Sequence, residues 1–319
     1  MPIDGPVPDM NDDPPELPRR TLLRYGGVGA ALAIAGCGAN DDGNADDGTD
    51  DGNTDDGSDN STDGEGGDGQ SQGPAAEFEL AGDGADRYSQ WLVPEYTLDA
   101  DSDAETKQLY QFNDYDRAEE AGWDSPLLFR DRFAEAYGVE PDAFESEVLV
   151  GPVENGRPRR ILFGSFDTTT IAEQLESNDI EQTGENGEFT VFGGQIAVSE
   201  DAIVQHDSFE AFLSASRAER ETIGETDEDV GLLLDLVPGG ALVTLSRRDG
   251  LDDVAVDAMS VSEFGDDGLQ SHAVRTVVFE EAGAVTDERI RELVVENSPF
   301  EEIVTQEISG RVAMAEVTR

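Results

Sequence analysis

Cysteine and lysine are almost absent from this chain of 319 residues, which contains one of each, Cys37 and Lys107. A single cysteine excludes a disulfide within the chain, so the folded part must be stable without one. Histidine is nearly as scarce, and neither His206 nor His272 has a second histidine or a cysteine at the spacing of a zinc site. The sequence therefore predicts no metal centre and no cofactor.

Catalytic and nucleotide-binding motifs are also lacking in residues 77–319, which hold no Walker A loop, dinucleotide fingerprint or Gly-x-Ser-x-Gly elbow. Carboxylates are so numerous that no pair can be singled out as a general acid and base. His206 precedes a predicted helix N-cap, where a polar side chain serves the turn. The sequence therefore favours a protein that is not an enzyme. A hydrolase that uses carboxylates or His272 is the alternative.

Positive charge is scarce, with 20 Lys and Arg against 73 Asp and Glu and a formal net charge of −53. Residues 76–319 alone carry 56 acids and 17 basic residues, so acidity is a property of the folded body and not only of the N-terminal region. Because no basic stripe exists, direct binding to nucleic acid is not expected. Molar salt shortens the Debye length to about 3 Å and weakens the repulsion between acids. We therefore expect the body to need salt to stay folded.

The hydrophobic run near the N-terminus is short. The uncharged segment 25–36 has 12 residues, whereas a helix that crosses a bilayer needs roughly 20. Its Ala- and Gly-rich composition is typical of the hydrophobic region of a signal peptide. Arg19 and Arg20 precede it, with Leu22 and Leu23 behind them, in the pattern of a twin-arginine export signal. The sequence therefore predicts export of a folded protein by the twin-arginine translocase.

The single cysteine ends this segment, in the sequence Ile34-Ala35-Gly36-Cys37. Small residues before the cysteine let a peptidase hold an extended backbone, and the thiol then carries the lipid. The sequence thus predicts a signal peptide over 1–36 and a lipid anchor at Cys37, on the outer face of the cell membrane. Residues 37–76 are rich in Asp and Gly and predict a disordered acidic tether. Asn60 begins the one glycosylation sequon, Asn-Ser-Thr.

Residues 77–319 are predicted to form one acidic domain. Short apolar segments, with alternation in 269–279, predict strands over 107–112, 147–151, 160–166, 188–192, 195–199, 202–205, 241–246, 254–264, 269–280, 302–308 and 311–317. Helical spacing follows four predicted N-caps: Asp114, Asp167, Asp207 and Thr286. The element order recurs in two halves, about 105–195 and 196–319. We expect an α+β fold with an antiparallel or mixed sheet, helices on one face, and tandem ferredoxin-like (split β-α-β) units.

Two clusters of arginine flank predicted strand ends, Arg157, Arg159 and Arg160 in one and Arg247 and Arg248 in the other. Guanidinium groups at these points would form a site for an anion or a carboxylate, unless they pair with the surrounding acids. Five aromatic residues near the start of the body either join the core or line a ligand groove: Trp91, Tyr96, Tyr110, Tyr115 and Trp123.

Arg19, Arg20 and Cys37 together resemble the twin-arginine-exported surface lipoproteins of haloarchaea, whose acid excess and near-absence of lysine this chain shares. The resemblance covers residues 19–75 and implies export and anchoring, and it implies no activity. We therefore expect a lipid-anchored extracytoplasmic surface protein with a non-enzymatic binding or interaction module. Its partner would be an unknown protein or small molecule. The alternatives are a surface hydrolase and a solute-capture lipoprotein of a transporter, which needs two lobes and a cleft.

Overall fold

The computed structural model describes residues 78–94, 106–154, 157–206, 208–248, 251, 253–265, 267–296 and 298–319. Within these ranges no helix has the length and apolar character needed to cross a membrane. The predicted signal peptide and tether lie outside them. So do six of the residues named in the sequence analysis: Arg19, Arg20, Leu22, Leu23, Cys37 and Asn60.

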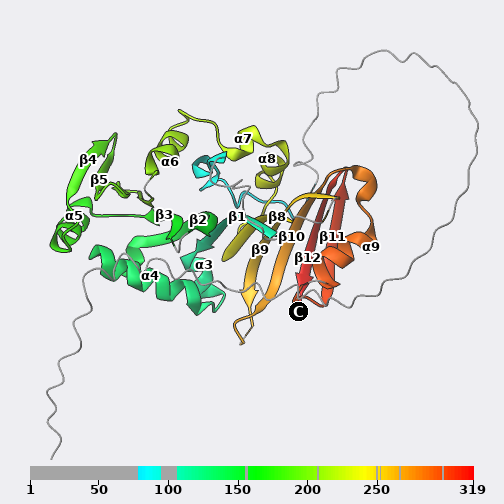
Figure 1. The fold of residues 1–319 in the computed structure, drawn as a ribbon. Helices are drawn as coiled ribbons and strands as arrows, with labels where there is room; N and C mark the ends of the chain where they lie inside the picture. Colours follow the sequence, from blue (N-terminus) through cyan, green and yellow to red (C-terminus); the bar gives the residue numbers. More distant parts are fainter. Residues whose placement is uncertain are drawn as a thin grey trace, which may run out of the picture.

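The described residues form one twelve-stranded sheet (Figure 1). Its strands are β1 (Thr106–Asp114), β2 (Phe144–Glu154), β3 (Arg157–Gly164), β4 (Gln182–Asn186), β5 (Phe189–Phe192), β6 (Ile196–Val198), β7 (Ala202–Gln205), β8 (Leu242–Arg248), β9 (Val254–Phe264), β10 (Gln270–Phe279), β11 (Glu302–Ser309) and β12 (Val312–Thr318). The order is β11-β12-β10-β9-β8-β1-β2-β3-β7-β6-β5-β4, and every neighbouring pair is antiparallel. An α+β fold with a large antiparallel sheet is thereby confirmed.

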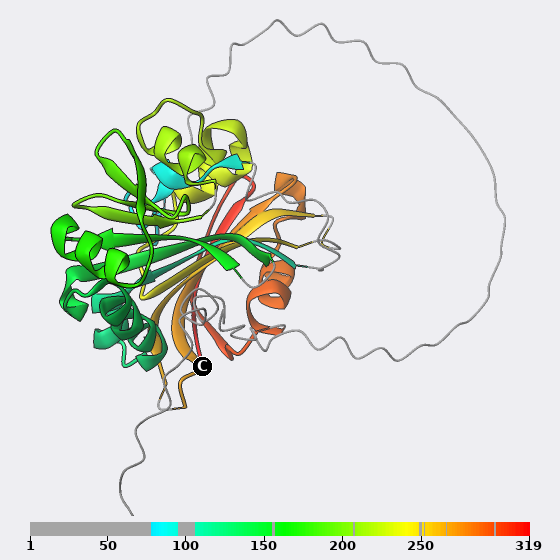
Figure 2. The same ribbon diagram turned by 60° about the vertical axis from the view of Figure 1, so that its left-hand side comes forward.

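Helices lie on both faces of this sheet, so the expectation of helices on one face is wrong (Figures 1 and 2). One face is covered by residues 78–94 with η2 (Ser89–Trp91), and by α6 (Phe209–Ser216), α7 (Ile223–Thr226) and α8 (Glu228–Leu234). The opposite face is covered by α3 (Tyr115–Glu120), α4 (Asp124–Tyr137), α5 (Thr168–Ser177), α9 (Asp287–Arg291) and η5 (Glu292–Glu296). The physical reason is visible in β9, where eight consecutive residues are buried. A strand buried on both sides needs cover on both sides.

The sheet consists of two similar halves that meet where β1 pairs with β8. In each half three strands form an antiparallel meander, β1-β2-β3 and β8-β9-β10. After α5 or α9, each half ends in a strand that pairs with the third meander strand, β7 with β3 and β12 with β10. Because β1 and β8 are antiparallel, an approximate two-fold rotation relates the halves. They span 106–205 and 242–319, with α6, α7 and α8 between them.

The tandem of ferredoxin-like units is not confirmed. In such a unit the strands on either side of the first helix are parallel and separated by another strand. Here β1 and β2 pair directly, with Asp114 opposite Ser146, because α3 and α4 together return the chain to the end of the sheet that it left. A split β-α-β connection occurs at β10-α9-β11, where β12 lies between the two strands.

Three of the predicted N-caps are found in the structure. The side chains of Asp114, Asp167 and Thr286 accept backbone N–H groups at the first turns of α3, α5 and α9. These N–H donors lower the pKa of Asp167. Asp207 lies outside the described residues, and Ser208 occupies the N-cap of α6.

Candidate functional site

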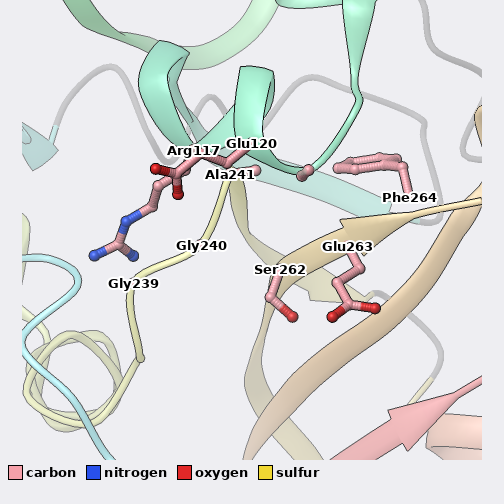
Figure 3. A pocket seen from close by; sticks show the side chains of 9 residues that line it. Arg117, Glu120, Gly239, Gly240, Ala241, Ser262, Glu263 and Phe264 are labelled. Carbon is pink, nitrogen blue, oxygen red and sulfur yellow. The ribbon is translucent and has the colours of Figure 1, made fainter.

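A pocket of about 520 Å³ opens at one end of the sheet (Figure 3). Three segments line it: α3 and the residue after it, the loop before β8, and the end of β9. The lining residues are Arg117, Glu120, Ala121, Gly239, Gly240, Ala241, Ser262, Glu263 and Phe264. Charged groups, backbone of a glycine loop and one aromatic ring therefore converge on a single hollow.

Close packing fixes the walls of this pocket. A Cβ atom on Gly240 would clash with Ser260 and with the backbone of Val261, so the loop approaches β9 this closely only because residue 240 is glycine, whereas Gly239 faces the movable guanidinium of Arg117. The ring of Phe264 stacks on Trp123, with centroids 4.5 Å apart and an interplanar angle of 13°. These contacts hold β9 against the loop before β8 and against Trp123, the N-cap residue of α4.

Ser262 begins a chain of hydrogen bonds across three adjacent strands. Its Oγ lies 2.5 Å from Nδ1 of His272 on β10, and Nε2 of His272 lies 2.8 Å from Oε1 of Glu316 on β12. A register shift beside His272 makes Ser262 the extra residue of a β-bulge, a feature that redirects side chains. Ser262 is exposed, and the side chains of His272 and Glu316 are 27% and 26% exposed. The group is therefore accessible to a ligand.

His206 has the local role that its position predicts. Its Nδ1 accepts the backbone N–H of Ser208 at 2.9 Å, at the turn into α6. Among the described residues, no group of three or more His, Cys, Asp or Glu side chains could hold a metal ion.

The structure does not bring the candidate anion-site arginines together. Arg160 is buried on the face covered by α4, 2.9 Å from Glu147, whereas Arg247 lies on the opposite face and pairs with Asp227 at the start of α8. Arg159 is buried on β3. The side chains of two further candidates lie outside the described residues: Arg157 and Arg248. Arg160 and Arg247 are therefore neutralised separately, each by an acid of its own.

The Arg160–Glu147 pair is the centre of a buried polar group. Glu147 is 2% exposed and Arg160 is 5% exposed. Asn113 donates to the second carboxylate oxygen at 2.7 Å, and the guanidinium lies 4.6 Å from the ring centroid of Phe133. Burial, and after it the negative charge of Glu147, raise the pKa of the Tyr115 hydroxyl. The charges therefore compensate each other within the core.

A second buried pair occupies the equivalent place in the other half. Arg275 on β10 donates to Asp257 on β9 at 2.7 Å, and Ser246 donates to the same carboxylate at 3.0 Å. In both pairs the acid lies on the second meander strand and the arginine lies on the third. The third strand has one residue directly opposite the acid, and the arginine precedes that residue by two positions. The two pairs support the two-fold relation between the halves.

Four of the five early aromatic residues are core residues. Tyr88 packs with two neighbours from β1, its ring centroid 4.5 Å from that of Phe112 and 5.2 Å from that of Tyr110. The buried members are Trp91, Tyr110, Tyr115 and Trp123, and Tyr96 lies outside the described residues. The core interpretation of these four is therefore confirmed.

The two edges of the sheet differ in character (Figure 1). The edge strand β4 has five residues, Gln-Thr-Gly-Glu-Asn, and no apolar side chain. The opposite edge strand β11 has eight residues, of which Val304 is 54% exposed and Ile308 is 45% exposed. No strand among the described residues pairs with the outer side of β11. A short polar edge resists further pairing, whereas β11 is longer and exposes two apolar side chains among its five polar residues, so it is the more open of the two edges.

Neither a family model nor a curated protein sequence matches this chain. Two crystal forms of TP0453 resemble it in structure. Crystal form I has 8% identity and a TM-score of 0.39 over 76% of this chain and 94% of that chain. Crystal form III has 9% identity and a TM-score of 0.36 over 72% and 92%. This likeness is too distant to carry an argument about function.

Proposed function

We propose that this chain is an exported lipoprotein, held on the outer face of the cell membrane through Cys37, whose body is a binding module. Its partner adds an extended segment to the edge strand β11. The observation that carries the proposal is the exposure of Val304 and Ile308 on an edge that no described strand covers. The polar, five-residue edge β4 has no such feature.

Strand addition suits this edge physically. The outer side of an edge strand presents N–H and C=O groups that an incoming segment can pair with, and side chains at alternate positions give selectivity. Charge indicates which kind of segment can bind at β11. Screening by molar salt leaves only charges at contact distance to select the partner. Because β11 carries Glu302 and Glu307, a second copy would bring like charges together there, whereas a segment with apolar and basic side chains would complement them. We assign the occupant as such a segment of another surface protein.

The two alternatives differ in their support. A solute-capture protein needs two lobes and a cleft, but the described residues form one continuous sheet, which counts against it. A surface hydrolase has one specific observation in its favour, the hydrogen-bonded chain Ser262–His272–Glu316.

Replacing Cys37 by serine should release the exported protein into the medium, because the lipid is its only proposed attachment. The double variant Arg19→Lys, Arg20→Lys should instead leave a folded, unlipidated precursor inside the cell. Fractionation and the mass of the N-terminal peptide measure both effects. Retention of Cys37→Ser in the membrane at the wild-type level would contradict the anchor.

A photo-reactive amino acid at position 304 should give a cross-linked product of one defined mass in native membranes at molar salt. The matched control is position 128 on α4, where Leu128 is 61% exposed and thus more accessible than Val304. We expect no defined product there. Equal products at both positions, or none at 304, would reject strand addition at β11.

A further inference from the structure

We propose that Ser262 is the nucleophile of an acyl-transfer site, with His272 as its base and Glu316 as the group that orients the imidazole. The proposal goes beyond the binding role and does not depend on it. It rests on a continuous chain of two short contacts, 2.5 Å from Ser262 Oγ to Nδ1 and 2.8 Å from Nε2 to Glu316. A nucleophile within hydrogen-bond distance of a base, which a third group orients, is the arrangement that activates a hydroxyl.

The donors and acceptors can be assigned in one consistent way. An ionised carboxylate only accepts, so Nε2 of a neutral His272 carries the proton and donates it to Glu316. Nδ1 is then an acceptor, and the hydroxyl of Ser262 donates to it. The carbonyl of His272 also lies near this hydroxyl, but at 3.5 Å it is a much weaker acceptor. The serine proton therefore points at the nitrogen that must remove it.

The two ring nitrogens of His272 are used in the opposite way from serine proteases. There Nε2 faces the serine, whereas here Nδ1 faces Ser262 and Nε2 faces Glu316. Proton transfer requires an acceptor nitrogen within hydrogen-bond distance, which Nδ1 provides here. The three side chains come from three neighbouring strands, β9, β10 and β12, of one antiparallel sheet. Sites on strands hold their side chains more firmly than sites on loops.

The pocket beside Ser262 indicates the class of substrate. Its charged lining residues are Arg117, Glu120 and Glu263, which sum to one negative charge. The guanidinium of Arg117 lies against Gly239, whereas Phe264 supplies an apolar wall (Figure 3). This lining favours a small ester that is neutral or cationic over one that is anionic. The structure thus assigns Ser262 a neutral or cationic ester as its substrate.

In the reaction, Ser262 Oγ forms a bond to the carbonyl carbon of the ester, and the bond from that carbon to the alcohol oxygen breaks. The serine proton passes to Nδ1 of His272 and from there to the departing alcohol. Water then attacks the acyl-serine, gives up one proton through the same nitrogen, and releases the carboxylic acid. The serine regains its proton, and no oxidant or reductant is needed.

The test uses the full folded chain in molar KCl with 4-nitrophenyl acetate and a fluorophosphonate probe. We expect phosphonylation of the peptide that contains Ser262, and a fall in the hydrolysis rate of about 10²–10⁴-fold for His272→Gln. Ser262→Ala should remove both label and turnover, whereas Ser271→Ala, on the same hairpin, should change neither. An anionic ester, 4-nitrophenyl succinate, should be hydrolysed more slowly than the acetate.

Glu316 is tested as a positioning residue. Glu316→Gln offers an amide that can donate to Nε2, which shifts the ring proton to Nδ1 and blocks the base, so the rate should fall while the melting temperature stays unchanged. Glu316→Asp should restore part of the rate. An unlabelled Ser262 in the wild-type chain, or equal turnover by Ser262→Ala and wild type, would overturn the proposal.

Discussion

Replacing Arg160 by methionine is expected to lower the free energy of unfolding by about 3–5 kcal/mol. The change leaves Glu147 as a carboxylate that is 2% exposed and has lost its counter-charge at 2.9 Å. Asn113 still donates one hydrogen bond to it, which offsets a small part of the loss. The contact of the guanidinium with the ring of Phe133, 4.6 Å from its centroid, is lost as well. A double variant that also lacks this contact is therefore needed to isolate the effect of the unpaired charge.

The matched control is the double variant Glu147→Met, Arg160→Met, which removes both charges at once. Buried ion pairs replaced by apolar residues of similar size are often neutral or stabilising, so the double variant should be more stable than the single one. Urea unfolding in 2 M KCl, followed by circular dichroism, measures all three proteins. A single variant within about 1 kcal/mol of wild type would show that water reaches Glu147 and that the pair is not buried in solution.

Removing salt should unfold the body altogether, which is the second large effect. With 56 acids and 17 basic residues over 76–319, most carboxylates have no arginine available to them. At 0.1 M ionic strength the Debye length is about 10 Å, so each carboxylate is repelled by several neighbours, whereas at 1 M it is about 3 Å. Many of the described arginines already form local ion pairs, as Arg289 does with Asp253 at 2.7 Å, so they cannot compensate the excess of acids.

Thermal unfolding between 0.05 and 3 M KCl measures this effect. We expect no cooperative transition at the lowest salt and a melting temperature that rises steeply above it. Sorbitol at equal osmolarity is the control, since it does not screen charge and should not replace KCl. A melting temperature that is the same in dilute buffer and in molar KCl would reject the account of the acidic surface.

The strands were largely predictable from the sequence, and their arrangement was not. The segment 254–264 is predicted as a strand and is β9 from end to end, because most residues from Val254 to Val261 are apolar and Asp267-Gly268 marks the turn that follows. The nearly continuous apolar composition of β9 does not reveal which face of the strand is buried. Alternation with a period of two is lost when both faces of a sheet are covered. No local sequence pattern predicts that β12 lies between β10 and β11, because that position depends on packing around α9.

The candidate site shows the same division between local and long-range information. His272 stood out because histidine is rare, and the hairpin turn between β9 and β10 places Ser262 near it, a signal that the expected strand ends already contained. Glu316 lies 44 residues from His272, and only the pairing of β10 with β12 brings them together. Asp257 also carried a signal, as an acid between apolar residues of its strand, whereas Glu147 does not stand out beside Glu145 on the same strand. The arginine partners of both acids follow from strand register.

Hydrogen exchange over 302–309 tests the central claim most directly, namely that β11 receives a strand from a partner on the cell surface. The lipidated protein in native membranes at molar salt is compared with the purified protein in the same salt. We predict slower exchange in β11 in the membranes and unchanged exchange in β4, the polar edge, which serves as the internal control. Equal exchange of β11 in both samples would contradict the account.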